Sequence, residues 1–335
     1  MVHLSYNTKD MSYIDAMKNG FRVIHRNWQL ILVQIGMMIV SFLGFFIIVG
    51  IPLAVAFIIF GIDLTGLIEI KDLLRVFQDP SKIVSRYFGL VLIVITSLLL
   101  YVVIAVSFGM YVFGGSVGVI GRAIQDITMK FSMRTFFHEA KKLFMRLFGF
   151  TAVIGIILII AAFVLGILGG GIAALVSFAR TQDSTLALFL GTFFSLILIL
   201  LALIFILGIL SITLYGVAAL FFKDIGPVKS LREAINYLMR HPNALWLYAM
   251  LFGGYVFISF FLILFRSPFE LIPVIGIILS FPFQLISYAI QTYIGLAIIA
   301  ILFTYYYSTE IFSVPVAESS IPQDTPQEKN AIQDT

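Results

Sequence analysis

The chain has 335 residues, of which 61% are hydrophobic and only 11% are charged, and its mean hydropathy is +1.09. A soluble domain carries about 25% charged residues, so the composition excludes an ordinary soluble protein and indicates a membrane protein. The net charge of +4 does not indicate a nucleic-acid partner, because the basic residues stand at the ends of apolar runs, and the lack of cysteine excludes disulfides and Cys-ligated metals.

The first stretch, up to residue 27, has the pattern of an amphipathic helix that lies in the membrane interface. Its apolar residues recur at helical spacing, and its basic residues share another face. The apolar positions are Ile14, Met17, Phe21 and Ile24, and the basic positions are Lys18, Arg22 and Arg26. We expect this helix to run up to Trp28, an anchor at the boundary of the hydrocarbon.

Six uncharged runs follow, each long enough to cross a hydrocarbon layer about 30 Å thick. They cover residues 28–62, 88–121, 147–179, 186–222, 243–265 and 271–309. We therefore predict an all-α transmembrane bundle of about six spans. Several runs exceed the required length, so breaks are expected at Gly50–Pro52 and at Pro282, where each could instead create a re-entrant segment.

The distribution of basic residues predicts the orientation in the membrane. Segment 121–146 alone carries six Lys and Arg residues between two uncharged runs. With the N-terminus inside, fifteen of the 21 Lys and Arg residues fall on the inner side and six on the outer side. The positive-inside rule therefore predicts a multi-pass protein of the cytoplasmic (inner) membrane with both termini in the cytoplasm.

An internal repeat is indicated by three segments that align without gaps, starting at residues 12, 132 and 226, each followed by two apolar runs. The alternative is that any basic amphipathic helix before a span aligns in this way. The repeat predicts one transmembrane domain, 1–312, built from units 12–119, 120–222 and 223–309, each an interfacial helix followed by a membrane hairpin. The polar, Pro-containing tail, 313–335, is expected to be disordered in the cytoplasm.

The first outer loop, 63–87, contains acidic residues that could be considered as a divalent-cation site. Lys71 and Arg75 stand at helical spacing from them, which favours a solvated, self-neutralised surface. The acids are Asp63, Glu69, Asp72 and Asp79. We expect neither a metal nor a cofactor.

The pattern Gly-x-Ser-x-Gly at residues 114–118 is typical of hydrolase nucleophiles, which also need a strand–turn–helix elbow and a histidine base. Here the pattern lies in an apolar helix, and all four histidines fall in predicted cytoplasmic segments. We therefore expect no catalytic residues and favour helix packing. Gly114 with Gly118, and Gly166 with Gly170, form Gly-x-x-x-Gly faces that let helices approach closely.

The sixth run carries the most polar intramembrane face. Its members, Gln284, Ser287, Tyr288, Gln291 and Thr292, fall on one side of a helix. Facing a neutral cavity, they could bind a headgroup or a polar solute. Facing another helix, they would form interhelical hydrogen bonds, which is the interpretation we favour.

Three arginines, Arg26, Arg146 and Arg240, occupy the same position in the three aligned segments. Guanidinium groups bind phosphate through paired hydrogen bonds, so one interpretation is that these arginines hold lipid headgroups. The other is that they are ordinary anchors that fix the orientation of each unit.

With these basic segments and the Gly-rich end of its second run, the chain resembles the six-span YciC-like membrane proteins of bacteria and archaea. It is also similar to the non-catalytic membrane domain that precedes some glycerophosphoryl diester phosphodiesterases. The resemblance implies a six-helix membrane module with no established chemistry. The catalytic barrel of the phosphodiesterases is absent, so no enzymatic residue can be transferred.

We expect a non-enzymatic membrane protein that acts as a scaffold, assembly factor or accessory subunit and packs against lipids, a protein partner or another copy of itself. The alternative is a facilitated carrier or binder of a lipid or neutral solute, and a membrane-embedded enzyme ranks third. The lack of ionisable residues within most runs argues against ion-coupled transport. A wet cavity beside Gln284 and Gln291 would favour the carrier, whereas a packed bundle with an exposed apolar flank would favour the scaffold.

Overall fold

The computed structural model describes residues 11–65, 88–270 and 275–312, and within these ranges the chain forms helices and turns without a strand. Six of the described helices are long and apolar enough to cross a membrane. The predicted all-α transmembrane bundle is therefore confirmed, and the chain is a multi-pass membrane protein. The predicted tail, 313–335, and most of the acidic outer loop, 66–87, lie outside the described residues.

The helices follow the apolar runs closely. The first span comprises α2 (Gln29–Phe45), the π-helical turn η1 (Phe46–Gly50) and α3 (Ile51–Thr65). The remaining spans are α6 (Phe88–Gln125), α7 (Met133–Gln182), α8 (Ser184–Phe222), α10 (Pro242–Glu270) and α11 (Ile275–Tyr306), which ends in the π-helical turn η2 (Tyr307–Ile311). Two shorter helices, α1 (Tyr13–Arg26) and α9 (Pro227–Arg240), lie outside the spans.

Neither expected break interrupts its span. The turn η1 ends at Gly50, and the helix continues directly into α3, which contains Pro52. The amide of Ile51 donates to the carbonyl of Phe46, five residues back instead of four, which accommodates the neighbouring proline that lacks a donor. Pro282 lies inside α11. Both sequences therefore continue a helix rather than creating a re-entrant segment.

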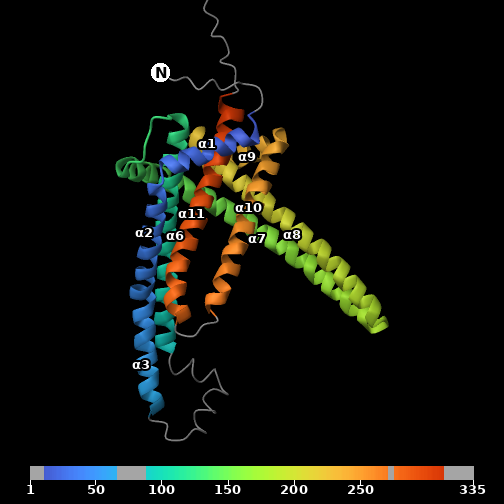
Figure 1. The fold of residues 1–335 in the computed structure, drawn as a ribbon. Coiled ribbons are helices and arrows are strands. Elements are labelled where there is room, and N and C mark those ends of the chain that lie inside the picture. Colours follow the sequence, from blue (N-terminus) through green and yellow to red (C-terminus); the bar gives the residue numbers. More distant parts are fainter. Residues whose placement is uncertain (1–10, 66–87, 271–274, 313–335) are drawn as a thin grey trace, which may run out of the picture.

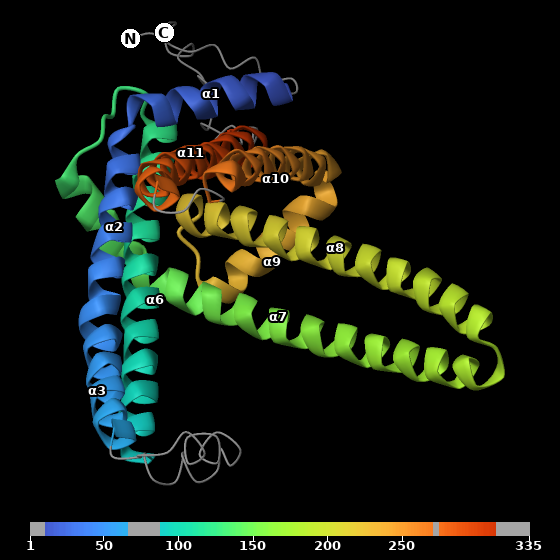
Figure 2. The ribbon, with the colours of Figure 1, turned by 60° about the horizontal axis from the view of Figure 1, so that its bottom comes forward.

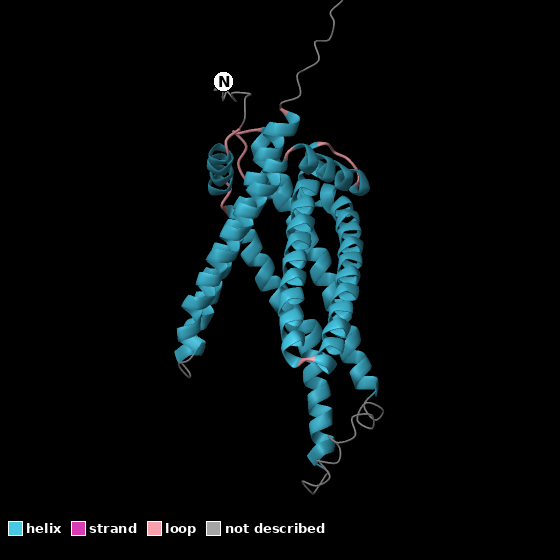
Figure 3. Cartoon of the chain, turned by 90° about the vertical axis from the view of Figure 1, so that its right-hand side faces the viewer, coloured by secondary structure: helices cyan, strands magenta, loops and turns pink. Residues whose placement is uncertain are grey.

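The helices meet at one end of the molecule and separate toward the other (Figures 1 and 3). We call this meeting point the junction end; it consists of α1, α9 and the adjoining ends of α6, α7, α8, α10 and α11. The helix α1 lies across it and packs on α11, while α9 packs on α8. From the junction end, the hairpin of α7 and α8 diverges at a wide angle from α2, α3 and α6 (Figure 2).

The core lies at the junction end, where large side chains are completely enclosed. They include Tyr215, Tyr237, Tyr306, Phe136, Phe150 and Phe303. Glycines make room for these side chains: a Cβ atom added to Gly121 of α6 would overlap the ring of Phe221 of α8. Large aromatic side chains packed against glycine positions therefore join the spans at this end.

The helix α1 docks on this core through small residues rather than through all of its predicted apolar face. Ala16 and Gly20 are buried, and a Cβ atom on Gly20 would overlap Ile301 of α11. Ile24 is buried as expected, but Ile14 and Phe21 are exposed. Small residues occupy buried positions because they let α1 lie close to α11, and the larger apolar side chains of Ile14 and Phe21 remain outside.

The outer part of the α7–α8 hairpin has few contacts with the other described helices. No residue in 155–178 of α7 or 188–208 of α8 is buried. The two helices touch along one seam, where a Cβ atom on Gly169 would lie 3.5 Å from Leu198, and one on Gly191 would lie 3.6 Å from Val176. In α7 the half-buried seam positions are Ile157, Ala161, Leu165, Gly169, Ile172 and Val176. No described helix covers the other faces of this outer part of the hairpin.

The three aligned segments do not form three equivalent helices. Asn27 ends α1 and His241 ends α9, whereas the matching Leu147 continues the helix. Leucine favours a helix, and it is followed by Phe148 where the third segment has Pro242, so the second segment fuses with its span into the single long helix α7. The threefold repeat stays a prediction.

Candidate functional site

The three arginines predicted to bind headgroups lie at the junction end in different surroundings. Arg146 of α7 forms an ion pair with Asp224, and the Nζ atom of Lys142 lies 3.3 Å from the same carboxylate oxygen. Hydrogen bonds from Arg146 and Lys142 hold the pKa of Asp224 below its ordinary value. The charge of Arg146 is therefore compensated within the protein.

Arg240 belongs to a network that ties α8, α9 and η2 together. The Nζ atom of Lys223 lies 2.7 Å from Glu233 Oε1 and 2.9 Å from Glu310 Oε1. The Nη2 atom of Arg240 lies 3.2 Å and 3.1 Å from the same two oxygens, and His241 Nε2 lies 3.8 Å from Glu310 Oε2. The hydrogen bond from Lys223 lowers the pKa of Glu233. Burial alone would lower the pKa of Lys223, but its two carboxylate partners raise it overall.

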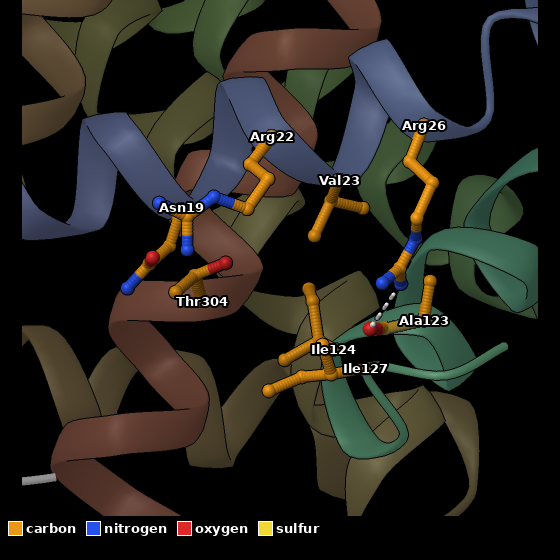
Figure 4. A pocket seen from close by; sticks show the side chains of 8 residues that line it. All are labelled: Asn19, Arg22, Val23, Arg26, Ala123, Ile124, Ile127 and Thr304. Atoms are coloured by element: carbon orange, nitrogen blue, oxygen red, sulfur yellow. Dashed lines mark hydrogen bonds between the residues drawn. The ribbon is translucent and has the colours of Figure 1, made fainter. Parts of the chain in front are cut away.

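Arg26 has no ion pair with any residue that the structure describes. It lines a pocket of about 40 Å³ between α1, α6 and α11, together with Arg22 and Asn19 (Figure 4). Its Nη2 atom donates a long hydrogen bond of 3.4 Å to the carbonyl of Ala123, and its Nε atom is buried without a partner. Of the three arginines, this is the one that forms no ion pair with a described carboxylate.

The polar face of the sixth span contributes one hydrogen bond between helices. The hydroxyl of Tyr288 donates to the backbone carbonyl of Gln34 in α2 at 3.4 Å. The side chain of Gln34 in turn donates to Ser116 Oγ of α6 at 3.0 Å. These contacts link α2, α6 and α11.

The rest of that face is not used in this way. Gln284 is exposed, Gln291 is half-buried, and neither forms a hydrogen bond with a described residue, while Ser287 Oγ is buried without a partner. Thr292 lines an open groove of about 340 Å³ between α2, α8, α10 and α11, which does not include Gln284 or Gln291. The groove is mainly apolar, and its polar side chains are Gln34, Tyr248, Tyr255 and Thr292.

The two Gly-x-x-x-Gly faces have opposite surroundings. A Cβ atom on Gly114 would lie 3.1 Å from Leu147 of α7, and one on Gly118 would overlap Glu139. No described atom of a neighbouring element lies within 4 Å of such an atom on Gly166 or Gly170. Among the described residues, the packing predicted at this second pair is therefore not found, because the α7–α8 seam passes through Gly169 instead.

Sequence reasoning missed an ion pair behind Gly118 whose carboxylate is buried. Glu139, only 1% exposed, accepts a hydrogen bond of 2.8 Å from Arg122 Nε, and Arg122 Nη2 lies 2.6 Å from the same oxygen. Its second oxygen, Oε2, is buried without a partner. The only signal was an isolated acid in a strongly basic segment. Ser116 of the Gly-x-Ser-x-Gly pattern is also buried, inside α6, and donates to the carbonyl of Val112 at 3.0 Å.

The fold and these sites define a six-span α-helical membrane protein with a polar junction end and a splayed hairpin. The sequence matches no protein-family model, no curated protein and no solved structure. The resemblance to YciC-like proteins and to phosphodiesterase membrane domains therefore remains an expectation from sequence.

Proposed function

We propose that this protein is a non-enzymatic scaffold, assembly factor or accessory subunit of the cytoplasmic membrane, with both termini in the cytoplasm. The observation that carries the proposal is the α7–α8 hairpin. Its central parts, 155–178 and 188–208, contain no buried residue and contact each other along one seam. A hairpin of this kind leaves most of its surface for lipids and for the helices of a partner.

A face of small residues on α7 supports a protein partner over lipid alone. Lipid chains are as apolar as leucine, so helices associate in a membrane mainly through close packing, which small residues permit. This face lies beside the seam and is exposed along its whole length; it consists of Ala162, Gly166, Gly170, Ala173 and Ser177. It suits a transmembrane helix of another protein or of a second copy.

The proposed orientation rests on charge. Most Lys and Arg residues belong to the segments next to the junction end, including α1, α9 and the start of α7. Positive segments are retained on the cytoplasmic side. In this orientation the junction end lies at the inner leaflet, and the hairpin reaches across the bilayer.

The test compares Gly170→Leu with Gly171→Leu. Both glycines have open space at the Cβ position, but they point about 100° apart around α7, so only the first substitution fills the small-residue face. Each protein is extracted with its native membrane patch and analysed by mass spectrometry. We expect a stoichiometric polypeptide partner with the wild type and Gly171→Leu, and its loss with Gly170→Leu. A wild-type preparation without any partner polypeptide would refute the proposal.

A second candidate function, binding or carrying a lipid or neutral solute, is favoured by the groove that Thr292 lines. Its apolar walls and few polar groups suit a molecule with an apolar body and a polar end. Gly295 lines the groove and has open space at the Cβ position, so Gly295→Phe would fill it. Gly253→Phe, on exposed α10 surface, is the matched control. Loss of one co-purifying lipid or solute only with Gly295→Phe would favour this function.

A further inference from the structure

The pocket beneath α1 is lined by two arginines, Arg22 and Arg26, that lack a described carboxylate partner. Lys18, Arg22 and Arg26 follow one another at intervals of four residues on α1, and none forms an ion pair with a described residue. Like charges at this spacing repel each other. We infer that this pocket is a binding site for one phosphate group, held by Arg26 and Arg22.

The hydrogen-bonding state of Arg26 is the first argument. A guanidinium offers five N–H donors in a planar fork, and in Arg26 the one hydrogen bond to a described residue is the long contact with Ala123. Its Nε atom is buried without a partner, which is costly unless another group completes it. Phosphate oxygens complete such a fork with two parallel hydrogen bonds.

The surrounding groups are the second argument. Figure 4 shows the side chains of Arg22 and Asn19 on one side of the pocket and Arg26 on the other, with Val23 between them. Arg22 adds a second positive charge, and the Asn19 amide adds neutral donors. The charge of Arg26 helps to lower the pKa of Asp126, but the two form no ion pair, and Asp126 accepts two hydrogen bonds from Thr128. No described carboxylate therefore occupies the place of the anion.

Size and location point to phosphate. The pocket of about 40 Å³ exceeds the roughly 10–15 Å³ of probe volume that one water molecule needs, and it is far smaller than the roughly 300 Å³ or more of a site for a larger ligand. Its size therefore suits a small anion such as a single phosphate group rather than a whole headgroup or a nucleotide. It lies under an amphipathic helix at the cytoplasmic end of the proposed orientation, where lipid phosphates are the most abundant anions. The shared chemistry is a phosphate ester or free phosphate. This site goes beyond the scaffold role and does not depend on it.

The experiment uses the full chain and two variants with equal loss of charge. Arg22→Gln/Arg26→Gln removes the proposed site, while Arg134→Gln/Lys141→Gln removes two exposed charges from the start of α7. Each protein is reconstituted in phosphatidylcholine vesicles containing phosphatidylglycerol, re-extracted, and weighed intact by mass spectrometry. We expect the wild type and control to retain one phosphatidylglycerol, and the site variant to retain it about tenfold less well.

A second arm identifies the source of the phosphate. The protein in lipid-free micelles is titrated with inorganic phosphate, and binding is measured by calorimetry. Binding there that the site variant loses, without selective retention of phosphatidylglycerol, assigns the pocket to free phosphate. Arg22→Gln alone, at an exposed position, covers the case in which the double variant does not fold. Equal behaviour of site and control variants in both arms would overturn the inference.

Discussion

Gly118 offers the most direct test of how the spans join. It lies on α6 against α7, and a Cβ atom added there would overlap the Cβ atom of Glu139 and lie 2.8 Å from its Cγ atom. Glu139 cannot easily move away, because it is buried and fixed by its ion pair with Arg122. Replacing Gly118 with alanine should therefore push α6 and α7 apart.

The magnitude follows from two opposing effects. An extra methyl group in a well-packed core costs about 1–3 kcal/mol. Alanine in place of glycine stabilises a helix interior by roughly 0.5–1 kcal/mol. We expect Gly118→Ala to lower the free energy of unfolding by about 1–2 kcal/mol, with more if the Arg122–Glu139 pair is disturbed.

The control is Gly170→Ala, because the same substitution there meets open space and should leave stability unchanged or slightly increased. Both variants are unfolded with denaturant in mixed micelles, and the free energies are compared with that of the wild type. If Gly118→Ala is as stable as Gly170→Ala, the described contact between α6 and α7 is wrong.

Three further predictions concern the charged groups of the junction end. Arg122→Ala leaves the buried Glu139 carboxylate without its partner and should destabilise the protein by about 1–3 kcal/mol, as measured by the same unfolding assay. The effect should exceed that of Glu139→Gln, because the side chain of Arg122 is 43% exposed and stays hydrated when its partner is removed; equal effects would contradict the burial of Glu139. The pKa of Glu233 is lowered in the folded state, so its ion pair stabilises the fold fully above the ordinary pKa of 4.5. This stabilisation is lost as the pH falls through the folded-state pKa. The difference in free energy of unfolding between the wild type and Glu233→Gln should therefore shrink below that pH. The pKa of Lys223 is raised in the folded state, so its ion pairs stabilise the fold fully below pH 10.5, and this stabilisation is lost as the pH rises through the folded-state pKa. The same measurement of unfolding free energy against pH, made on the wild type and Lys223→Gln, checks this prediction.

The spans could be predicted from sequence because uncharged runs and hydrocarbon thickness are local properties. The fusion of the second amphipathic segment with the following span, which makes the single helix α7, is also a local property. Leu147 and Phe148 stand where the third segment has His241 and Pro242, but the repeat was inferred from the positions that the segments share. Helix breakers decide such boundaries more strongly than a shared apolar pattern does.

The sites could not be predicted in the same way, because residues in the same sequence pattern contact different neighbours in the folded chain. Gly114 with Gly118 and Gly166 with Gly170 share one motif, yet only the first pair meets a neighbouring helix. Three aligned arginines likewise differ: among the described residues, carboxylates from α9, η2 and the α8–α9 connection reach Arg146 and Arg240 but not Arg26. Which segment supplies a partner depends on the angles between helices, which a single sequence does not state.

The central claim is that the free small-residue face of α7 contacts another polypeptide. Because the chain has no cysteine, a single cysteine at Gly170 or Gly171 can carry a photoreactive crosslinker at a unique position. Irradiation in native membranes should crosslink the Gly170→Cys protein to one polypeptide, a second copy or a different protein as its mass decides, and leave the Gly171→Cys protein joined to lipid. Crosslinks to lipid alone from both positions would contradict the scaffold role.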